Sequence, residues 1–278
     1  HTRCLSDWSS DVCSSDLVLW AVHSFTLFRF GDTDRFYHLA LSKILALNGS
    51  FSLESLPQVD DLGWKNYFPD KEFLFHVFTS IGYRIAGENG AEIIVLLIAA
   101  SGALALFFFS ATLLPLWQAF LCAFSIFFTH SFVFRMTLLR PHVVSVPLFL
   151  FFLSALACKK SRSAGIFAGL FMLSYHAFYL PLIAIAAAMA FSFLEAEAEQ
   201  KEIQKSCAYS LAGFFVGILI NPYFPANVVM GWVHLQIPFL LNGSLKGVGF
   251  GMEAFPLNGP GLLKFFYLPF LILAGILY

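Results

Sequence analysis

The chain has 278 residues, of which 59% are hydrophobic and only 12% are charged, and its mean hydropathy is +0.77. Soluble domains have about 45–50% apolar and about 25% charged residues, so this chain has too few polar side chains to cover a soluble globule. The net charge of −1 provides no field that would attract nucleic acid. The composition argues against a soluble domain, a nucleic-acid-binding protein and a disordered chain, and it favours an integral membrane protein.

The first 17 residues differ from the rest, because they are polar and rich in Ser and Asp and then change abruptly to an apolar run at Val18. They lack the basic start and the small-residue cleavage site of a signal peptide. They resemble translated adaptor sequence, so residues 1–17 are left out of the fold prediction. At the other end the chain stops at Tyr278, inside an apolar run. We therefore expect one domain over residues 18–278 that is truncated at its C-terminus.

Apolar segments of about 20 residues predict membrane-spanning helices. The candidates in chain order are 18–30, 92–115, 117–134, 142–158, 164–194, 207–220 and 262–278. Segment 164–194 is too long for one span and is interrupted at 174–181, so it is either one bent helix or two short ones. Segment 73–87 is ambiguous because it is short and carries His76 and Arg84. These segments predict an all-α fold, a polytopic bundle of transmembrane helices.

Two long segments, 31–72 and 221–261, are not membrane-like. Loops of this length in a compact protein are usually functional or disordered, and their aromatic residues suit the membrane interface. The densest basic cluster between spans, at 159–162, should face the cytoplasm. If segment 73–87 does not span, this orientation places loop 31–72 and the turn at 135–141 on the outer side.

Acidic residues are unevenly distributed. None lies between Glu92 and Glu195, whereas the first loop holds seven of the chain's 17 acids: Asp32, Asp34, Glu54, Asp60, Asp61, Asp70 and Glu72. The run from Glu195 to Glu202 is most simply a solvated connector. Chemistry that depends on carboxylates should therefore draw on the first loop or on Glu253, the acid of the second long loop.

The segment after residue 31 combines acids with helical periodicity. The apolar residues at the spacing of one helix face are Phe36, Leu39, Ala40, Ile44 and Leu47. They predict an amphipathic helix in the membrane interface, with Asp32 or Asp34 near its N-terminus and with Asp34 and His38 on its polar face. The alternative is that the two acids are only a helix cap and a solvated residue.

Further candidate residues follow along the chain. Pro69 and Asp70 predict the start of a helix that carries His76 back toward the membrane, although a helix start without a catalytic role explains them equally well. His176 lies within an apolar stretch and marks a helix break; a histidine in such a place is more often a packing residue than a ligand. Glu253 faces either the same cavity or the solvent.

The turn from Arg135 to His142 contains two arginines beside apolar spans. An arginine in this position is costly without a partner, so Arg135 and Arg140 are functional candidates. A guanidinium group binds phosphate through two hydrogen bonds, and His142 could add another donor. The alternative is that both arginines anchor helix ends at the interface.

These motifs together resemble the GT-C superfamily of polytopic glycosyltransferases, and most closely its bacterial members related to dolichyl-phosphate-mannose protein mannosyltransferases. The resemblance is carried by the Asp-x-Asp of Asp32 and Asp34 before Phe-Tyr-His-Leu, by Phe-Pro-Asp-Lys-Glu-Phe-Leu-Phe-His at 68–76, and by Leu-Arg-Pro-His at 139–142. It implies transfer from a lipid-linked sugar on the outer side of the membrane, here a bacterial plasma membrane. It also implies that the catalytic acid is Asp32 or Asp34.

The chemistry of the candidate residues fits this resemblance. A carboxylate at headgroup depth can accept the proton of the attacking hydroxyl, and Arg135, Arg140 or His142 can stabilise the departing lipid phosphate. Asp32 and Asp34 could instead hold a divalent cation, Mg²⁺ or Mn²⁺, on the phosphate. The other residues that we expect at the substrate are His38, Asp70, His76, His176 and Glu253. The sequence leaves the acceptor open.

Two other classes of protein fit parts of the pattern. A transporter or lipid flippase without covalent chemistry also has broken helices and few intramembrane charges. Transporters tend to place charged sites near the membrane midplane, whereas the acids here cluster in one interfacial loop, which favours the enzyme. A scaffold subunit of a membrane complex is the third interpretation.

Overall fold

The computed structural model describes residues 33–56, 67–127 and 129–241, which contain helices and no strand. The helices within these residues are α2 (Thr33–Asn48), α3 (Phe73–Ala111), α4 (Leu116–Phe127), α5 (His130–Thr137), α6 (His142–Ala157), α7 (Ser161–Ser174), α8 (Tyr179–Ser192), α9 (Glu197–Leu219) and α10 (Ala226–Leu241). The predicted all-α class is confirmed. The adaptor-like segment 1–17, the expected spans 18–30 and 262–278, Asp32 and Glu253 lie outside the described residues.

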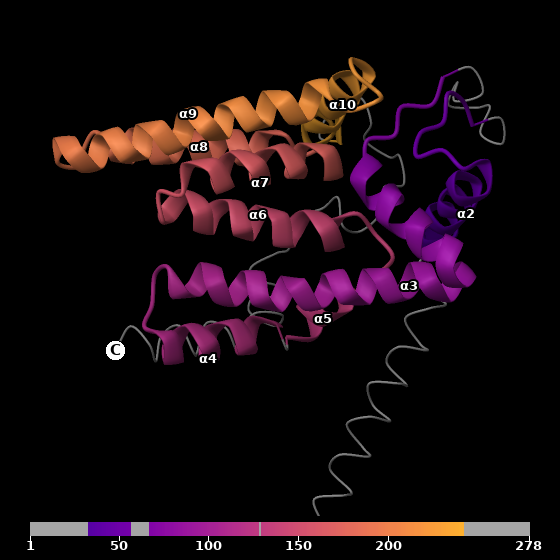
Figure 1. Ribbon diagram of the computed structural model, residues 1–278, viewed down its shortest axis with the longest axis horizontal. Helices are drawn as coiled ribbons and strands as arrows, with labels where there is room; N and C mark the ends of the chain where they lie inside the picture. Colours follow the sequence, from indigo (N-terminus) through magenta and orange to yellow (C-terminus); the bar gives the residue numbers. More distant parts are fainter. Residues whose placement is uncertain (1–32, 57–66, 128, 242–278) are drawn as a thin grey trace, which may run out of the picture.

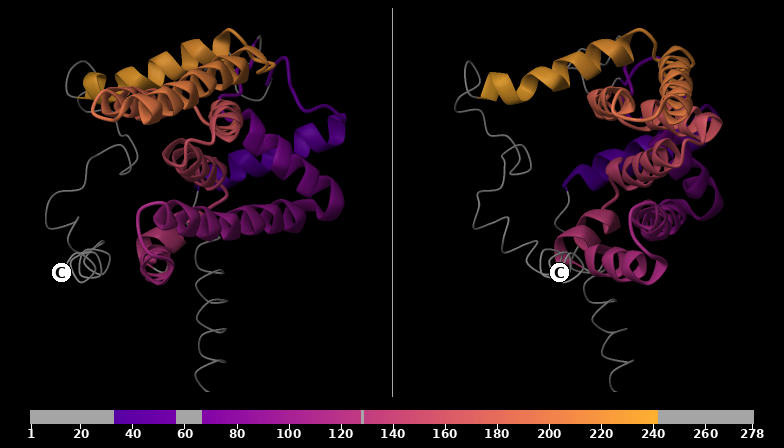
Figure 2. Two further views of the ribbon diagram at one scale, coloured as in Figure 1. Left: turned by 60° about the vertical axis from the view of Figure 1, so that its left-hand side comes forward. Right: turned by 90° about the vertical axis from the view of Figure 1, so that its left-hand side faces the viewer.

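The helices pack as a layered stack in which α4, α3, α6, α7 and α9 follow one another across the molecule (Figure 1). Helix α8 lies against α9, and α2 packs on the first part of α3 at one end of the stack (Figure 2). Buried apolar side chains from α6 to α9 form one core cluster, and those from α2, α3, α5 and α6 form a second. The two clusters share α6, so this helix joins the halves of the stack.

Helix α3 consists of two helical segments that meet at a sharp kink. Ala86 and Gly87 have non-helical backbone angles, and Gly87 has φ +61°, a conformation that glycine adopts at no steric cost. A Cβ atom at Gly82 or at Gly90 would overlap the carbonyl of the other residue, so the two segments touch through glycine backbone. The ambiguous segment 73–87 is thus helical, and the kink sets it at an angle to the apolar segment that follows.

Helices α7 and α9 make the most extensive helix–helix contact in the described part of the chain. Each carries a Gly-x-x-x-Gly pair, Gly165 and Gly169 on α7 and Gly213 and Gly217 on α9. A Cβ atom at Gly165 would lie 2.7 Å from the carbonyl oxygen of Tyr209, and one at Gly169 would lie 2.9 Å from that of Gly213. Such pairs of small residues let helix backbones approach closely, as they often do in membranes.

Several predicted elements agree with the structure, and two differ. Helix α6 begins at His142 as predicted, and the break between α7 and α8 falls within the predicted interruption at 174–181. The predicted span 117–134 is wrong as one element, because α4 ends at Phe127 and α5 begins at His130. The run at 195–202 is mostly exposed, as predicted, but it is not a connector, because α9 begins at Glu197. Glu197 and Glu199 stabilise the first turn of α9 through the helix dipole.

Within the described residues, α3 is the one helix that is long and apolar enough to cross a membrane by length and composition. Three shorter apolar helices accompany it: α4, α6 and α8. Large apolar side chains are exposed along the stack, among them Leu97, Leu104, Phe108, Trp117, Phe120, Phe124, Ile183, Phe191, Phe215 and Leu219. Soluble monomers seldom expose contiguous apolar surface on this scale, so the stack offers a wide apolar face to its surroundings.

Candidate functional site

Two imidazoles and two carboxylates are buried together where α2 packs on the start of α3. His38 Nδ1 lies 2.9 Å from His76 Nε2, and His76 Nδ1 lies 2.8 Å from Asp70 Oδ2. Glu72 adjoins them, and the ligand atoms of His38, Glu72 and His76 all lie within 4.8 Å of one another. The structure therefore brings three sequence-predicted candidates, His38, Asp70 and His76, into one buried group, which we call the His–carboxylate cluster together with Glu72.

Asp70 organises this cluster. Its Oδ1 accepts the backbone N–H of Glu72 at 2.8 Å, and its Oδ2 accepts the Nδ1–H of His76. One carboxylate thus holds both the last residue before α3 and an imidazole one turn inside the helix. Because Nδ1 of His76 donates to Asp70, the neutral form of the ring carries a lone pair on Nε2, which faces His38 Nδ1 at 2.9 Å.

Helix α2 is present as predicted, but the face that it buries differs from the predicted apolar face. His38, which was expected beside Asp34 on the polar face, is buried, whereas Phe36 and Leu47 of the apolar face are 62% and 73% exposed. The physical reason is a polar seam between α2 and α3, in which Ser42 Oγ lies 2.7 Å from Thr79 Oγ1. Polar side chains are buried without a large cost when each one has a hydrogen-bond partner.

Burial controls the protonation of the cluster. It lowers the pKa of His38 well below its ordinary value, and the neighbouring His76 and the charge of Arg140 lower this pKa further. Burial also lowers the pKa of His76, but the charge of Asp70 and its hydrogen bond outweigh burial and raise the pKa above its ordinary value. Burial also raises the pKa of Glu72, against the opposing effect of Lys71. His38 is therefore neutral at neutral pH, and Glu72 binds a proton more readily than an exposed glutamate does.

A pair of oppositely charged groups lies at the edge of the cluster. Arg140 Nη2 is 3.2 Å from Asp34 Oδ2, which joins the first turn of α2 to the turn before α6. In the same turn, His142 Nε2 donates to the carbonyl oxygen of Arg135 at 2.5 Å, at the end of α5. The structure thus places a predicted acid, Asp34, directly against a predicted phosphate-binding residue, Arg140.

A cavity of about 250 Å³ opens beside Lys71 and His176. Its walls are mostly apolar and come from α7, α8, α9 and α10: Met172, Phe178, Leu182, Phe214, Phe215, Ile218 and Val228. Two buried polar atoms of its lining, His176 Nδ1 and Asn227 Oδ1, have no hydrogen-bond partner among the described residues. A buried polar atom without a partner is costly, so these two atoms are available to form hydrogen bonds with a polar group in the cavity.

Lys71 links the cavity to the His–carboxylate cluster. Its Nζ donates to His234 Nε2 at 2.9 Å and lies 3.7 Å from Glu72 Oε1. His176 Nδ1 lies 3.8 Å from the same Glu72 oxygen. Burial, with the charge of Lys71, lowers the pKa of His176 to about 2 and also lowers that of His234. One lysine cation therefore stands between neutral imidazoles on one side and carboxylates on the other.

Sequence reasoning missed three residues of this region: Lys71, Glu72 and His234. The first two lie in the Asp70–Glu72 run, and three charges directly before an apolar helix are a signal that could have drawn attention to them. His234 has no such signal, because its place beside Lys71 depends on how α10 packs. The candidates Asp32 and Glu253 lie outside the described residues, so the expected pairing of Asp32 with Asp34 on a cation stays a prediction.

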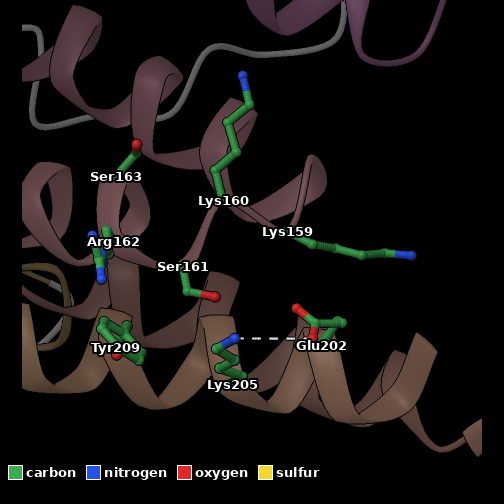
Figure 3. Close-up of a pocket in the computed structure, with 8 residues that line it drawn as sticks. All are labelled: Lys159, Lys160, Ser161, Arg162, Ser163, Glu202, Lys205 and Tyr209. Carbon is green, nitrogen blue, oxygen red and sulfur yellow. Dashed lines mark ion pairs between the residues drawn. The ribbon is translucent and has the colours of Figure 1, made fainter. Parts of the chain in front are cut away.

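A second, basic pocket lies at the other end of the stack, where α6 connects to α7 (Figure 1). It has a volume of about 350 Å³ and is lined by Lys159, Lys160, Ser161, Arg162, Ser163, Glu202, Lys205 and Tyr209 (Figure 3). Lys159 and Lys160 point away from each other, and Lys205 turns toward Glu202 on the same helix (Figure 3). Two of the basic residues pair with acids of α9, Lys159 with Glu199 and Lys205 with Glu202.

Comparison of the chain with models of known protein families, with curated proteins and with solved structures finds no match.

Proposed function

We propose that the chain is part of an integral membrane glycosyltransferase, which transfers a sugar from a polyprenyl-phosphate donor to an acceptor on the outer side of the membrane. The observation that carries the proposal is the apolar cavity beside Lys71. A polyprenyl phosphate combines an apolar chain with an anionic head, and this cavity combines apolar walls with a cation and two unpartnered polar atoms. The choice of a polyprenyl phosphate comes from the resemblance, and the chemistry of the cavity is compatible with it.

Lys71 lines the cavity, and Asp34 and Arg140 form an ion pair at the edge of the His–carboxylate cluster to which Lys71 is joined; we assign the parts of a transfer reaction to these three groups. The acceptor hydroxyl attacks the anomeric carbon of the sugar, its oxygen forms the new glycosidic bond, and its proton passes to the Asp34 carboxylate. The bond between the anomeric carbon and the phosphate oxygen breaks, and the lipid phosphate leaves with the electron pair. Arg140 and Lys71 stabilise the negative charge on that phosphate.

The distribution of charge along the stack supports the orientation. The basic pocket at 159–162 and the His–carboxylate cluster lie at opposite ends of the helices (Figure 1). Because basic residues are enriched on the cytoplasmic side of membrane proteins, the position of the basic pocket supports an outer position for the cluster. The exposed apolar side chains between the two ends would face the lipid.

Transfer can be tested with the full-length protein reconstituted in liposomes that contain polyprenyl-phosphate sugars with a radioactive sugar group. The wild-type protein is expected to release polyprenyl phosphate and to transfer the labelled sugar to an acceptor. Where no acceptor is present, the sugar is transferred to water and is released as free labelled sugar. Asp34→Asn should lower the rate by about 10²–10⁴-fold, because the general base is lost. Glu54→Gln is the matched control, since Glu54 is an exposed acid of the same loop, and it should retain activity.

The same experiment separates the enzyme from a transporter or flippase. Movement of the intact labelled lipid across the membrane without cleavage, at equal rates in wild type and Asp34→Asn, would contradict the proposal. Cleavage of the labelled lipid at equal rates in both proteins would contradict only the role of Asp34 as the base, and sugar transfer itself would still be supported.

A further inference from the structure

The ligand atoms of the His–carboxylate cluster have the spacing of a metal centre. Two nitrogens that bind one ion at about 2.0–2.1 Å, with an angle of about 90–110° at the ion, lie about 2.9–3.4 Å apart. His38 Nδ1 and His76 Nε2 are 2.9 Å apart. The Glu72 carboxylate lies within 4.8 Å of both. Two ligand atoms of one ion lie at most about 4.4 Å apart, so binding would draw this carboxylate closer. Among the described residues this is the one group of three such side chains.

The support around the cluster is also that of a metal centre. A histidine that binds a metal usually donates its other ring N–H to a carboxylate, which fixes the ring and its tautomer. His76 does so, since its Nδ1 donates to Asp70 Oδ2. A metal ion would replace the hydrogen bond that Nε2 now shares with His38 Nδ1. Asp70 also holds the backbone of Glu72 through Oδ1. One carboxylate therefore positions two of the three ligands.

The chemical class of the ion follows from the ligands. Two imidazoles and one carboxylate suit zinc and its first-row neighbours, whereas Mg²⁺ prefers oxygen ligands and keeps several waters. The group is buried, which leaves little room for a hydrated ion. We infer that His38, Glu72 and His76 form a binding site for a zinc-type divalent ion, which joins α2 to the start of α3. This site is distinct from the carboxylate pair of Asp32 and Asp34, and it does not rest on sugar transfer.

Metal content tests the inference directly. The full-length protein, purified through a tag without histidine, is stripped with EDTA, incubated with Zn²⁺, desalted and analysed by mass spectrometry for bound zinc. The wild type should hold about one ion per chain. The His38→Ala/His76→Ala double variant should hold none, and Asp70→Asn should weaken the affinity by about 10–100-fold. His234→Gln is the control, because it removes a nearby histidine of the same region, and it should keep its zinc.

A second measurement does not depend on how well the variants fold. Co²⁺ is added to the stripped wild-type protein, and its visible spectrum is compared with that of Co²⁺ in buffer. Strong bands of a nitrogen–oxygen site with low coordination number are expected, together with a higher thermal unfolding temperature in the presence of Zn²⁺. A spectrum equal to that of free Co²⁺, or full zinc content in the double variant, would overturn the inference.

Discussion

Arg140 Nη2 lies 3.2 Å from Asp34 Oδ2, so two segments that are a hundred residues apart in sequence meet at one point. Asp34 is 52% exposed on its side chain, and an ion pair with so exposed a partner contributes little to stability. The value of the pair therefore lies in position. It holds a carboxylate and a guanidinium group side by side at the edge of the His–carboxylate cluster. The proposed sugar transfer needs both groups, the carboxylate as the base and the guanidinium group to bind the phosphate.

The first prediction concerns Arg140. Replacing Arg140 by Gln should lower kcat/KM for a polyprenyl-phosphate sugar by roughly 10–100-fold, because one charge-assisted hydrogen bond to the phosphate is worth about 1.5–3 kcal/mol. Arg140→Lys should recover part of the loss, since it keeps the charge and loses the two-pronged geometry. The rates are measured in liposomes by release of the labelled sugar.

Arg162→Gln serves as the control for Arg140, because Arg162 lines the basic pocket at the other end of the stack. It should leave kcat/KM unchanged. Equal losses in the two variants would mean that the effect comes from overall charge, and the role given to Arg140 would then be wrong.

The second prediction concerns Tyr223, whose buried hydroxyl accepts the backbone N–H of Leu53 at 2.9 Å. This bond ties the segment after α2 to the segment after α9. Tyr223→Phe should lower the free energy of unfolding by about 1 kcal/mol and speed hydrogen exchange at the Leu53 amide, because that N–H loses its partner. Tyr67→Phe, at an exposed tyrosine, should change neither quantity. Unchanged exchange at Leu53 in Tyr223→Phe would show that the bond does not hold this segment.

Much of the secondary structure could be predicted from local patterns. The start of α6 at His142 and the break near His176 follow from hydrophobic runs and their interruption, and the amphipathic α2 follows from periodicity. The faces of α2 could not be predicted in this way, because His38 is buried by pairing with His76 on another helix. The spacing of apolar residues within α2 carries no information about His76, the partner of His38 that lies 38 residues further along the chain.

The site shows the same limit. Asp34, His38, Asp70, His76, Arg140 and His176 could be selected from residue type and from their place beside apolar segments. Their grouping depends on the kink at Gly87 and on the packing of α2 against α3, which are tertiary features. The cavity beside Lys71 is formed where the four consecutive helices α7 to α10 meet Lys71, which lies about a hundred residues earlier, so no local pattern could indicate it.

The third prediction concerns the close contact of α7 and α9. Gly213→Ile should lower the thermal unfolding temperature in detergent, since even a Cβ atom at this position would overlap the Gly165 carbonyl. Overpacking of this kind costs about 1–3 kcal/mol. Ala212→Ile, on the exposed side of the same turn of α9, is the matched control and should have little effect. If both variants unfold at the wild-type temperature, the two helices do not pack through these glycines.

The last prediction concerns pH and the contact between Lys71 and His234. Burial and the charge of Lys71 lower the pKa of His234 below its ordinary 6.5, and His176, which faces it at a ring distance of 4.2 Å, is shifted in the same direction. Below pH 6.5 the unfolded chain then binds more protons than the folded chain, so the free energy of unfolding decreases as the pH falls through this window. Above pH 6.5 both histidines are neutral in the folded and the unfolded chain, so they cause no loss of stability there.

Lys71→Met should reduce this loss of stability on acidification, because removing the cation raises the pKa of both histidines toward the ordinary value. Glu72 acts in the same sense, since loss of Lys71 raises its pKa further and lets the folded chain bind a proton. The difference in thermal unfolding temperature between pH 7.5 and pH 5.5 should therefore be smaller in Lys71→Met than in wild type. NMR titration of labelled histidine isolates His234, whose pKa should rise in the variant. An unchanged His234 titration would mean that burial alone, and not Lys71, sets its pKa.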